Sequence, residues 1–180
     1  LPTYLHNFYE LETEDAALRT AVFVVIAVAC RPLGGALADR FPGAWVLIVS
    51  YTVTGLMAAA ATERMPLVSA DAGTFYPVGT AVFLFMAASL GTASGAVFAL
   101  VAELVEPTAV GSVTGIVGAV GGLGGFVPPL LLGYFWTAHG NYRVGLLLLF
   151  VLSIATAALT WLWFLRTRRS EPAATERTPA

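Results

Sequence analysis

Residues Gly111 to Pro129 read GSVTGIVGAVGGLGGFVPP, and this stretch decides the fold class. Its glycines recur at intervals of four, three, four and three residues. That spacing places them on one face of a helix, along almost its whole length. A glycine costs about 1 kcal/mol relative to alanine in a soluble helix, so such a helix needs a compensating reason. We name the five glycines at this spacing the glycine ladder: Gly111, Gly115, Gly118, Gly122 and Gly125. Gly121 and Gly124 widen the glycine face.

Two physical explanations of the glycine ladder are open from its spacing. In a lipid bilayer, helices associate by close packing, and a glycine face lets two backbones touch. Alternatively, a face without side chains exposes the backbone to whatever passes along it. Pro128 and Pro129 are expected to disturb the helix, because proline removes a helical hydrogen bond. A second stripe of small residues, at intervals of four, predicts helix packing at Ala87, Gly91, Gly95 and Ala99.

The composition indicates an integral membrane protein. Hydrophobic residues make up 58% of the 180 residues and charged residues 11%, with a mean hydropathy of +0.81. Soluble domains carry about 25% charged residues. The nine basic residues are all arginine and form no basic patch, so nucleic acid is not an expected partner. The single Cys30 permits no internal disulfide, and its apolar surroundings favour a packing role.

Hydropathy along the chain predicts an all-α membrane protein with about five transmembrane helices, in one C-terminal helix bundle over residues 16–165. Segments of about 20 apolar residues are long enough to cross a lipid bilayer. Residues 1–15 are aromatic and then acidic, and we expect an extracytoplasmic loop at the end of a truncated helix. Residues 166–180 are expected to form a cytoplasmic tail. The predicted spans are 16–38, 44–62, 78–102, 109–136 and 144–165.

The ends of the chain bear on its topology. Residues 1–15 lack the basic start and apolar core of a signal peptide, and the first residue is leucine. We therefore expect the C-terminal part of a longer protein. Five spans place the two ends on opposite sides of the cell membrane, and arginine is enriched on the cytoplasmic side. That side is expected to carry Arg40, Arg166, Arg168, Arg169 and Arg177, and the other side Arg19, Arg64 and Arg143.

Arg31 is the most informative polar residue, because it lies only about a turn past the middle of the first span. A charge at that depth costs several kcal/mol and is usually functional. No Asp or Glu lies deep in a predicted span, so its counter-charge is expected to be an acid in a missing part of the protein or a bound anion. Snorkelling to the interface is the alternative. With the bare ladder face beside it, the guanidinium fork predicts a site for a small oxyanion.

Other chemistries find less support in the sequence. His6 and His139 lie in predicted loops without metal-ligand spacing, so neither a metal nor a cofactor is expected. No Ser-His-Asp arrangement falls within a span, and the glycine run is not followed by Lys-Ser or Lys-Thr of a phosphate-binding loop. An enzyme is therefore not expected. Glu103 and Glu106 can carry protons in a coupled transporter, but solvation of a helix end is the favoured interpretation.

The segment GGALADRFPG, residues 34–43, resembles the loop signature of the major facilitator superfamily. In that superfamily such a loop joins the second and third helices of each six-helix half on the cytoplasmic side. Ala44 and Trp45 stand where a basic pair is usual. The residues that match the signature are Gly35, Asp39 and Arg40.

The glycine ladder resembles the second nitrate signature of the nitrate/nitrite porter family, NarK-type members of the same superfamily. Its position, in the fifth helix of a half, also agrees. The stretches LPTYLHNFY (1–9) and DAALRTAVFVVIAVACRPLGGALADR (15–40) are similar to that family's seventh-to-eighth helix region. GTASGAVFALV (91–101) resembles its tenth helix, with Ser94 where asparagine is frequent.

This resemblance implies transport of nitrate and/or nitrite by alternating access, with the chain supplying helices eight to twelve of twelve. Arg31 would match one of two arginines that clamp the anion, and Gly115 and Gly118 would approach it. The partner arginine would lie in a missing N-terminal half, without which the chain is not expected to transport. Helix packing and gating would involve Gly111, Gly121, Gly122, Gly125, Gly91 and Gly95.

Two other interpretations stay open. A major facilitator transporter of another small organic anion or drug would share the fold, but a bulky substrate needs a lined pocket rather than a bare helix face. A non-transporting membrane scaffold or truncated fragment would have no need of Arg31. An intramembrane enzyme would need paired acids, histidine or a nucleophile at depth.

Overall fold

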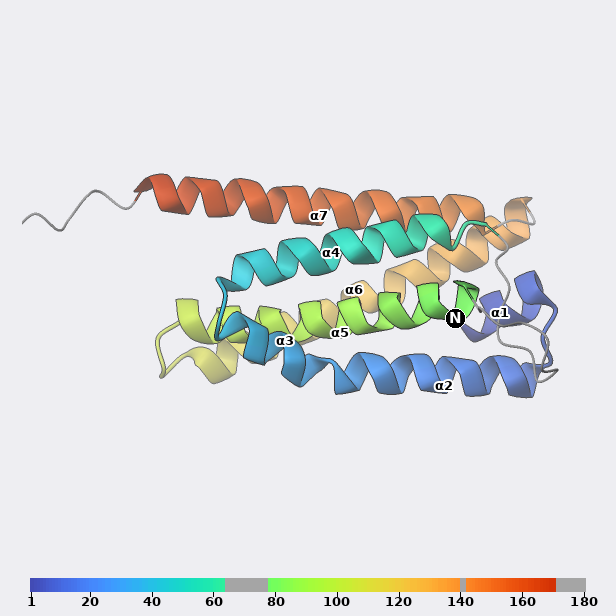
Figure 1. Ribbon diagram of the computed structural model, residues 1–180, viewed down its shortest axis with the longest axis horizontal. Coiled ribbons are helices and arrows are strands. Elements are labelled where there is room, and N and C mark those ends of the chain that lie inside the picture. The colour runs from blue at the N-terminus through green and yellow to red at the C-terminus, as the bar shows by residue number, and fades with distance from the viewer. Residues whose placement is uncertain (64–77, 140–141, 171–180) are drawn as a thin grey trace, which may run out of the picture.

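The computed structural model describes residues 1–63, 78–139 and 142–170 (Figure 1). These residues form helices joined by short connections, and they contain no strand. Five segments are long and apolar enough to cross a membrane, which confirms the predicted all-α membrane fold. The helices are α1 (Pro2–Tyr9), α2 (Thr13–Ala29), α3 (Arg31–Ala38), α4 (Gly43–Ala60), α5 (Val78–Leu104), α6 (Val110–His139) and α7 (Arg143–Ser170).

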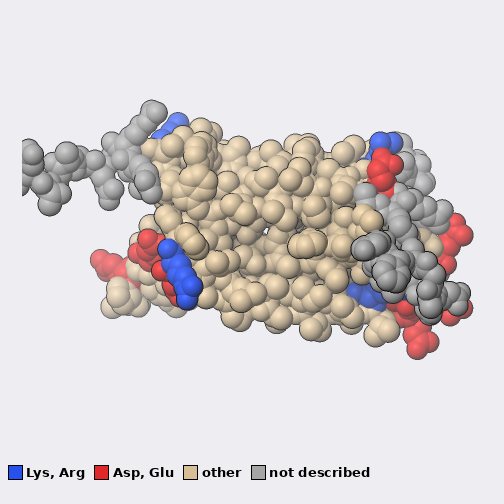
Figure 2. Space-filling model, in the orientation of Figure 1, with Lys and Arg blue, Asp and Glu red and all other residues tan. Residues whose placement is uncertain are grey.

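On the face of the bundle drawn in Figure 2, the charged side chains lie at the two ends. The long helices run side by side along one axis (Figure 1), and the middle of the face drawn in Figure 2 carries no charge. This face therefore presents an uncharged belt between charged ends, as a lipid bilayer requires.

The first fifteen residues differ from the predicted loop, because Pro2–Tyr9 form helix α1. Proline suits the first turn of a helix, since its missing N–H would have no partner there. The helix ends at Glu10, whose φ of 59° is left-handed. Helix α2 then begins at Thr13, earlier than predicted, with the acidic Glu14 and Asp15 in its first turn, where the helix dipole favours negative charge.

Other predicted boundaries hold or shift. The first span ends at Ala38 as predicted, so the segment 34–43 that resembles a superfamily loop is helical in its first half, and only residues 39–42 connect α3 to α4. The predicted tail over 166–180 begins as helix, because α7 continues to Ser170. Arg64, the rest of the loop before α5, and the end of the tail with Arg177 lie outside the described residues.

Helix α4 packs between α5 and α7. On the α5 side, the hydroxyl oxygens of Thr54 and Ser89 lie 2.8 Å apart, and both side chains are buried. On the α7 side, the ring of Trp45 meets Trp161 edge to face at a centroid distance of 5.0 Å, and Phe164 at 6.1 Å. Aromatic packing and paired hydroxyls thus fix α4 on both of its neighbours.

Helix α5 contacts α2 and α3 backbone to backbone. At three glycines, an added Cβ would overlap a carbonyl oxygen of the facing helix, so only glycine permits the approach. The overlap involves backbone, which cannot rotate away as a flexible side chain can. We name these residues the glycine seam: Gly34 faces Thr92, Gly91 faces Ala27 and Gly95 faces Arg31.

Helix α6 lies at the edge of the bundle and contacts α5 and α7 only sparsely. None of its residues whose side chains the structure describes is buried. An added Cβ at any glycine from Gly111 to Gly125 would meet nothing within 4 Å. Within the described residues the glycine ladder is therefore an open face, and close packing of it needs a partner other than these helices.

Pro128 and Pro129 lie inside α6 without ending it, so the expected disturbance does not interrupt the helix. Each proline lacks the N–H that would bond the carbonyl four residues earlier. Those carbonyls belong to Gly124 and Gly125, which are exposed. Because Gly124 and Gly125 have no side chains, their carbonyl groups can tilt away from the proline rings, and the helix continues.

Helix α1 packs across one end of the bundle through Tyr4, which is buried. Its hydroxyl donates a hydrogen bond to the carbonyl oxygen of Ala61, at 2.9 Å. Its ring meets Phe83 and Tyr142 edge to face, with centroid distances of 5.9 and 5.1 Å. Burial, followed by the nearby tyrosines, raises the pKa of Tyr4 above its ordinary value of 10.

A Tyr4→Phe substitution is expected to lower the free energy of unfolding by about 1–2 kcal/mol, because the Ala61 carbonyl loses its donor. Since the pKa of Tyr4 is raised in the folded state, this tyrosine contributes stability that is intact below pH 10 and is lost as the pH rises above it. Thermal unfolding in detergent below and above pH 10 measures both effects. Equal alkaline destabilisation of the variant and the parent would contradict the assignment to Tyr4.

Candidate functional site

The first membrane-spanning segment is interrupted at Cys30. Pro32 lacks the N–H that would bond the carbonyl of Val28, so α2 ends at Ala29 and α3 begins at Arg31. The proline falls in the first turn of α3, where the missing donor costs little. The interruption places Arg31 at a junction of two helices inside the apolar length of one span.

The backbone and the side chain of Arg31 have different surroundings. Its carbonyl oxygen lies against Gly95 of the glycine seam, which fixes the main chain. Its side chain is exposed, and no carboxylate in the described part of the chain pairs with it. A charge within a membrane span needs compensation. An arginine without a counter-charge among the described residues is therefore suited to hold an anion.

Arg31 lines a cavity of about 590 Å³ between α5 and α6. Gly118, Gly121 and Gly122 form most of the α6 wall, where Val117 is the only α6 side chain among the described lining residues. Its other polar lining groups are hydroxyls of Tyr51 and Ser94, a pattern of few polar groups among apolar walls that is typical of small-ligand sites. The complete lining is Arg31, Tyr51, Leu90, Ala93, Ser94, Val97, Phe98, Val117, Gly118, Gly121 and Gly122.

The structure brings together some of the predicted site residues and separates others. Arg31 and Gly118, predicted to contact the substrate, line the same cavity. So do Gly121 and Gly122, which were predicted to serve packing and gating. The ladder residues that do not line the cavity are Gly111, Gly115 and Gly125.

The loop motif lies away from this cavity. Gly35 is part of α3, with open space where a Cβ would stand, and does not belong to a loop. Asp39 caps the C-terminal end of α3, where its N–H donates to the carbonyl of Gly35 at 3.0 Å. Asp39 and Arg40 line a separate cavity of about 630 Å³ together with Glu103 at the end of α5.

Tyr51 was missed in the sequence analysis, and Ser94 was given no part in the site. Each is one of several hydroxyl-bearing residues in its span, so the sequence alone does not single it out or say which way its side chain faces. Their meeting at one cavity depends on how α4 and α5 pack. The ring of Tyr51 packs against a buried cluster of Val46, Leu47, Ala93 and Ala96.

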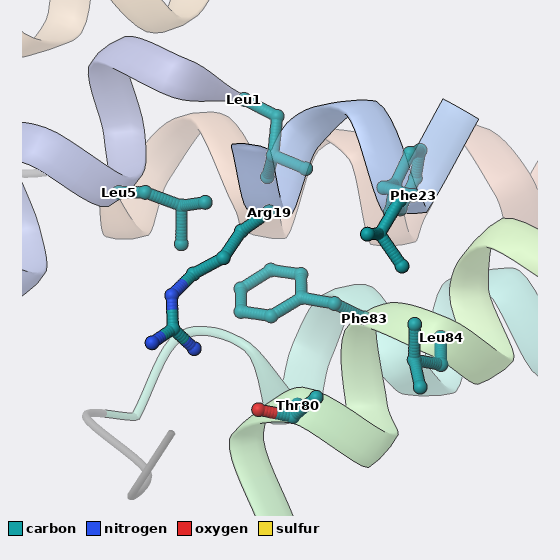
Figure 3. A pocket seen from close by; sticks show the side chains of 8 residues that line it. Leu1, Leu5, Arg19, Phe23, Thr80, Phe83 and Leu84 are labelled. Atoms are coloured by element: carbon teal, nitrogen blue, oxygen red, sulfur yellow. The ribbon is translucent and has the colours of Figure 1, made fainter. Parts of the chain in front are cut away.

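A smaller cavity, of about 200 Å³, lies among α1, α2 and α5 (Figure 3). Arg19 extends into it between Leu5 and Phe83. Unlike Arg31, Arg19 has a counter-charge, since its Nε lies 2.9 Å from a carboxylate oxygen of Asp15. The charge of Arg19 is therefore already compensated, and the cavity beside Arg31 is the better anion site.

Comparison with known proteins agrees with this architecture. Residues 1–180 match the family model of the Major Facilitator Superfamily. The chain belongs to this superfamily. The five apolar helices that are long enough to cross a membrane agree with this membership.

Among curated relatives, the chain is similar to NarK-type members of the superfamily. It is 42% identical over 161 residues to "Probable nitrate/nitrite transporter NarK2" of Mycobacterium tuberculosis (strain ATCC 25618 / H37Rv), covering 89% of the chain and 39% of that protein. It is 33% identical over 163 residues to "Probable nitrate transporter NarT" of Staphylococcus carnosus (strain TM300), with the same two coverages. The chain therefore spans about two fifths of the length of these relatives.

Proposed function

We propose that this chain is the C-terminal half of a nitrate/nitrite transporter and supplies Arg31 to a central oxyanion site. The observation that carries the proposal is the cavity that Arg31, without a described counter-charge, shares with three glycines of α6, Gly118, Gly121 and Gly122. A guanidinium offers a planar fork of donors, which matches the planar shape of nitrate and nitrite. The names of the similar proteins support the same choice of anion.

Transport is proposed to proceed by alternating access, with two six-helix halves rocking around the anion. The five described spans would correspond to helices eight to twelve. The open face of α6 supports this mechanism, because a helix face without side chains lets another half approach closely and slide. That other half would complete the anion site from the opposite side.

The orientation in the cell membrane belongs to the same proposal. The connection between α3 and α4, with Arg40, lies at the same end of the bundle as the C-terminal end of α7, with Arg166 (Figure 1). Arginine is enriched on the cytoplasmic side of membrane proteins. We therefore assign this end, and the C-terminus, to the cytoplasm.

Flux of nitrate and nitrite into vesicles that carry the full-length protein containing this chain tests the proposal. Saturable flux of either anion, absent from empty vesicles, would support it. No flux of either anion at normal membrane levels would overturn the proposed substrates and leave the fold as it stands.

A Gly118→Leu substitution is expected to lower anion flux more than tenfold, because the new side chain enters the cavity beside Arg31. The helix itself has room for a Cβ at this position, so the melting temperature should not fall. Flux per membrane-inserted protein, with thermal unfolding alongside, measures both. Parental flux in the variant would exclude this wall of the cavity from the anion path.

A further inference from the structure

Two hydroxyls in the cavity are left without partners by the fold. Among the described residues, neither Tyr51 nor Ser94 makes a side-chain hydrogen bond, and both line the cavity beside Arg31. Hydroxyls in membrane helices usually bond to a carbonyl of the preceding turn. Seven threonines in the described part of the chain do so with the carbonyl four residues earlier: Thr20, Thr52, Thr54, Thr92, Thr137, Thr156 and Thr160.

Packing holds both hydroxyls in place relative to Arg31. Ser94 directly precedes Gly95, whose backbone lies against the carbonyl oxygen of Arg31. This contact of the glycine seam therefore holds the backbone of Ser94 at a fixed position relative to the backbone of Arg31. Tyr51 is partly buried, and its ring packs against a cluster that includes Ala93, the residue before Ser94. The hydroxyls are therefore preorganised donors on rigid helices, and do not depend on a loop to reach a ligand.

We infer that Tyr51 and Ser94 donate hydrogen bonds to the bound anion and set its preference for nitrate over nitrite. This inference rests on the proposed function. The fork of Arg31 engages two oxygens of a planar oxyanion. Nitrate has a third oxygen, which needs a further donor, and a neutral hydroxyl supplies one. Nitrite has no third oxygen, so it gains less from the same hydroxyls.

The test is the half-saturation concentration for nitrate and for nitrite, measured in vesicles with the full-length protein. In Tyr51→Phe, which keeps the ring and removes only the hydroxyl, the value for nitrate should rise about tenfold, as expected when a charged acceptor loses one donor. The value for nitrite should change by less than about threefold. Ser94→Ala should likewise raise the half-saturation concentration for nitrate more than that for nitrite.

Tyr134→Phe is the matched control, because Tyr134 is exposed on α6 and does not line the cavity. It should leave both half-saturation values unchanged. Equal changes for the two anions in Tyr51→Phe and Ser94→Ala, or no change in either variant, would overturn the inference. If these variants behave like the parent while Arg31→Gln abolishes flux, only the inference fails. If the parent carries neither anion, the proposed function fails with it.

Discussion

An Arg31→Gln substitution is expected to lower nitrate flux at least about 100-fold, the largest functional effect foreseen for this chain. Each charge-assisted hydrogen bond contributes about 1.5–3 kcal/mol, and the fork of Arg31 can make two of them to one anion. Glutamine is polar but neutral, so it removes both the charge and the fork. Arg31→Lys keeps the charge without the fork and should retain intermediate flux. Vesicle uptake at matched membrane levels measures the series.

The same substitution separates an anion ligand from a structural ion pair. Because no described carboxylate pairs with Arg31, its removal should leave the melting temperature of the protein unchanged or raise it. Arg19→Gln is the control, since Arg19 already pairs with Asp15, and it should preserve the half-saturation concentration for nitrate. Normal flux in Arg31→Gln would indicate that the guanidinium snorkels to the interface and takes no part in transport.

The sequence predicts the number and approximate positions of the spans, because an apolar segment of about 20 residues in a bilayer can bond its backbone only as a helix. It fails at α1, which is only eight residues long and shows no long apolar segment. It places the end of the first span at Ala38, as in the structure, but does not say what the glycines of α3 contact. In the structure those glycines serve helix contact at Gly34 and leave Gly35 open.

The candidate site is only partly visible in the sequence. Arg31 is recognisable because a charge within an apolar span needs a reason. The glycine stripes are recognisable too, but the sequence does not say which of them packs against a neighbouring helix. Gly91 and Gly95 touch the backbone of α2 and α3, whereas the longer glycine ladder is open within the described residues. Tyr51 enters the site only through the packing of α4 on α5, which a helical period does not specify.

The glycine seam gives the largest expected effect on stability, and two adjacent glycines of α3 provide a matched pair. Gly34→Ala is expected to lower the free energy of unfolding by about 3 kcal/mol, because the new methyl group overlaps the backbone of Thr92 and one helix must move. Gly35→Ala places the same methyl group in open space. It should be neutral or stabilising by up to about 1 kcal/mol, since alanine favours the helix. Thermal unfolding of the full-length protein in detergent compares the two.

The comparison is informative because both variants replace glycine with alanine, in the same helix and at nearly the same depth in the membrane. They differ only in what the new methyl group faces. Equal melting temperatures for Gly34→Ala and Gly35→Ala would mean that α3 and α5 do not touch as described. The seam also links stability to transport. Gly34 lies one turn after Arg31, so a displacement of α3 from α5 carries the guanidinium away from the glycine wall of α6. The fraction of Gly34→Ala protein that still folds should therefore bind nitrate more weakly, which a helix-propensity effect alone would not produce.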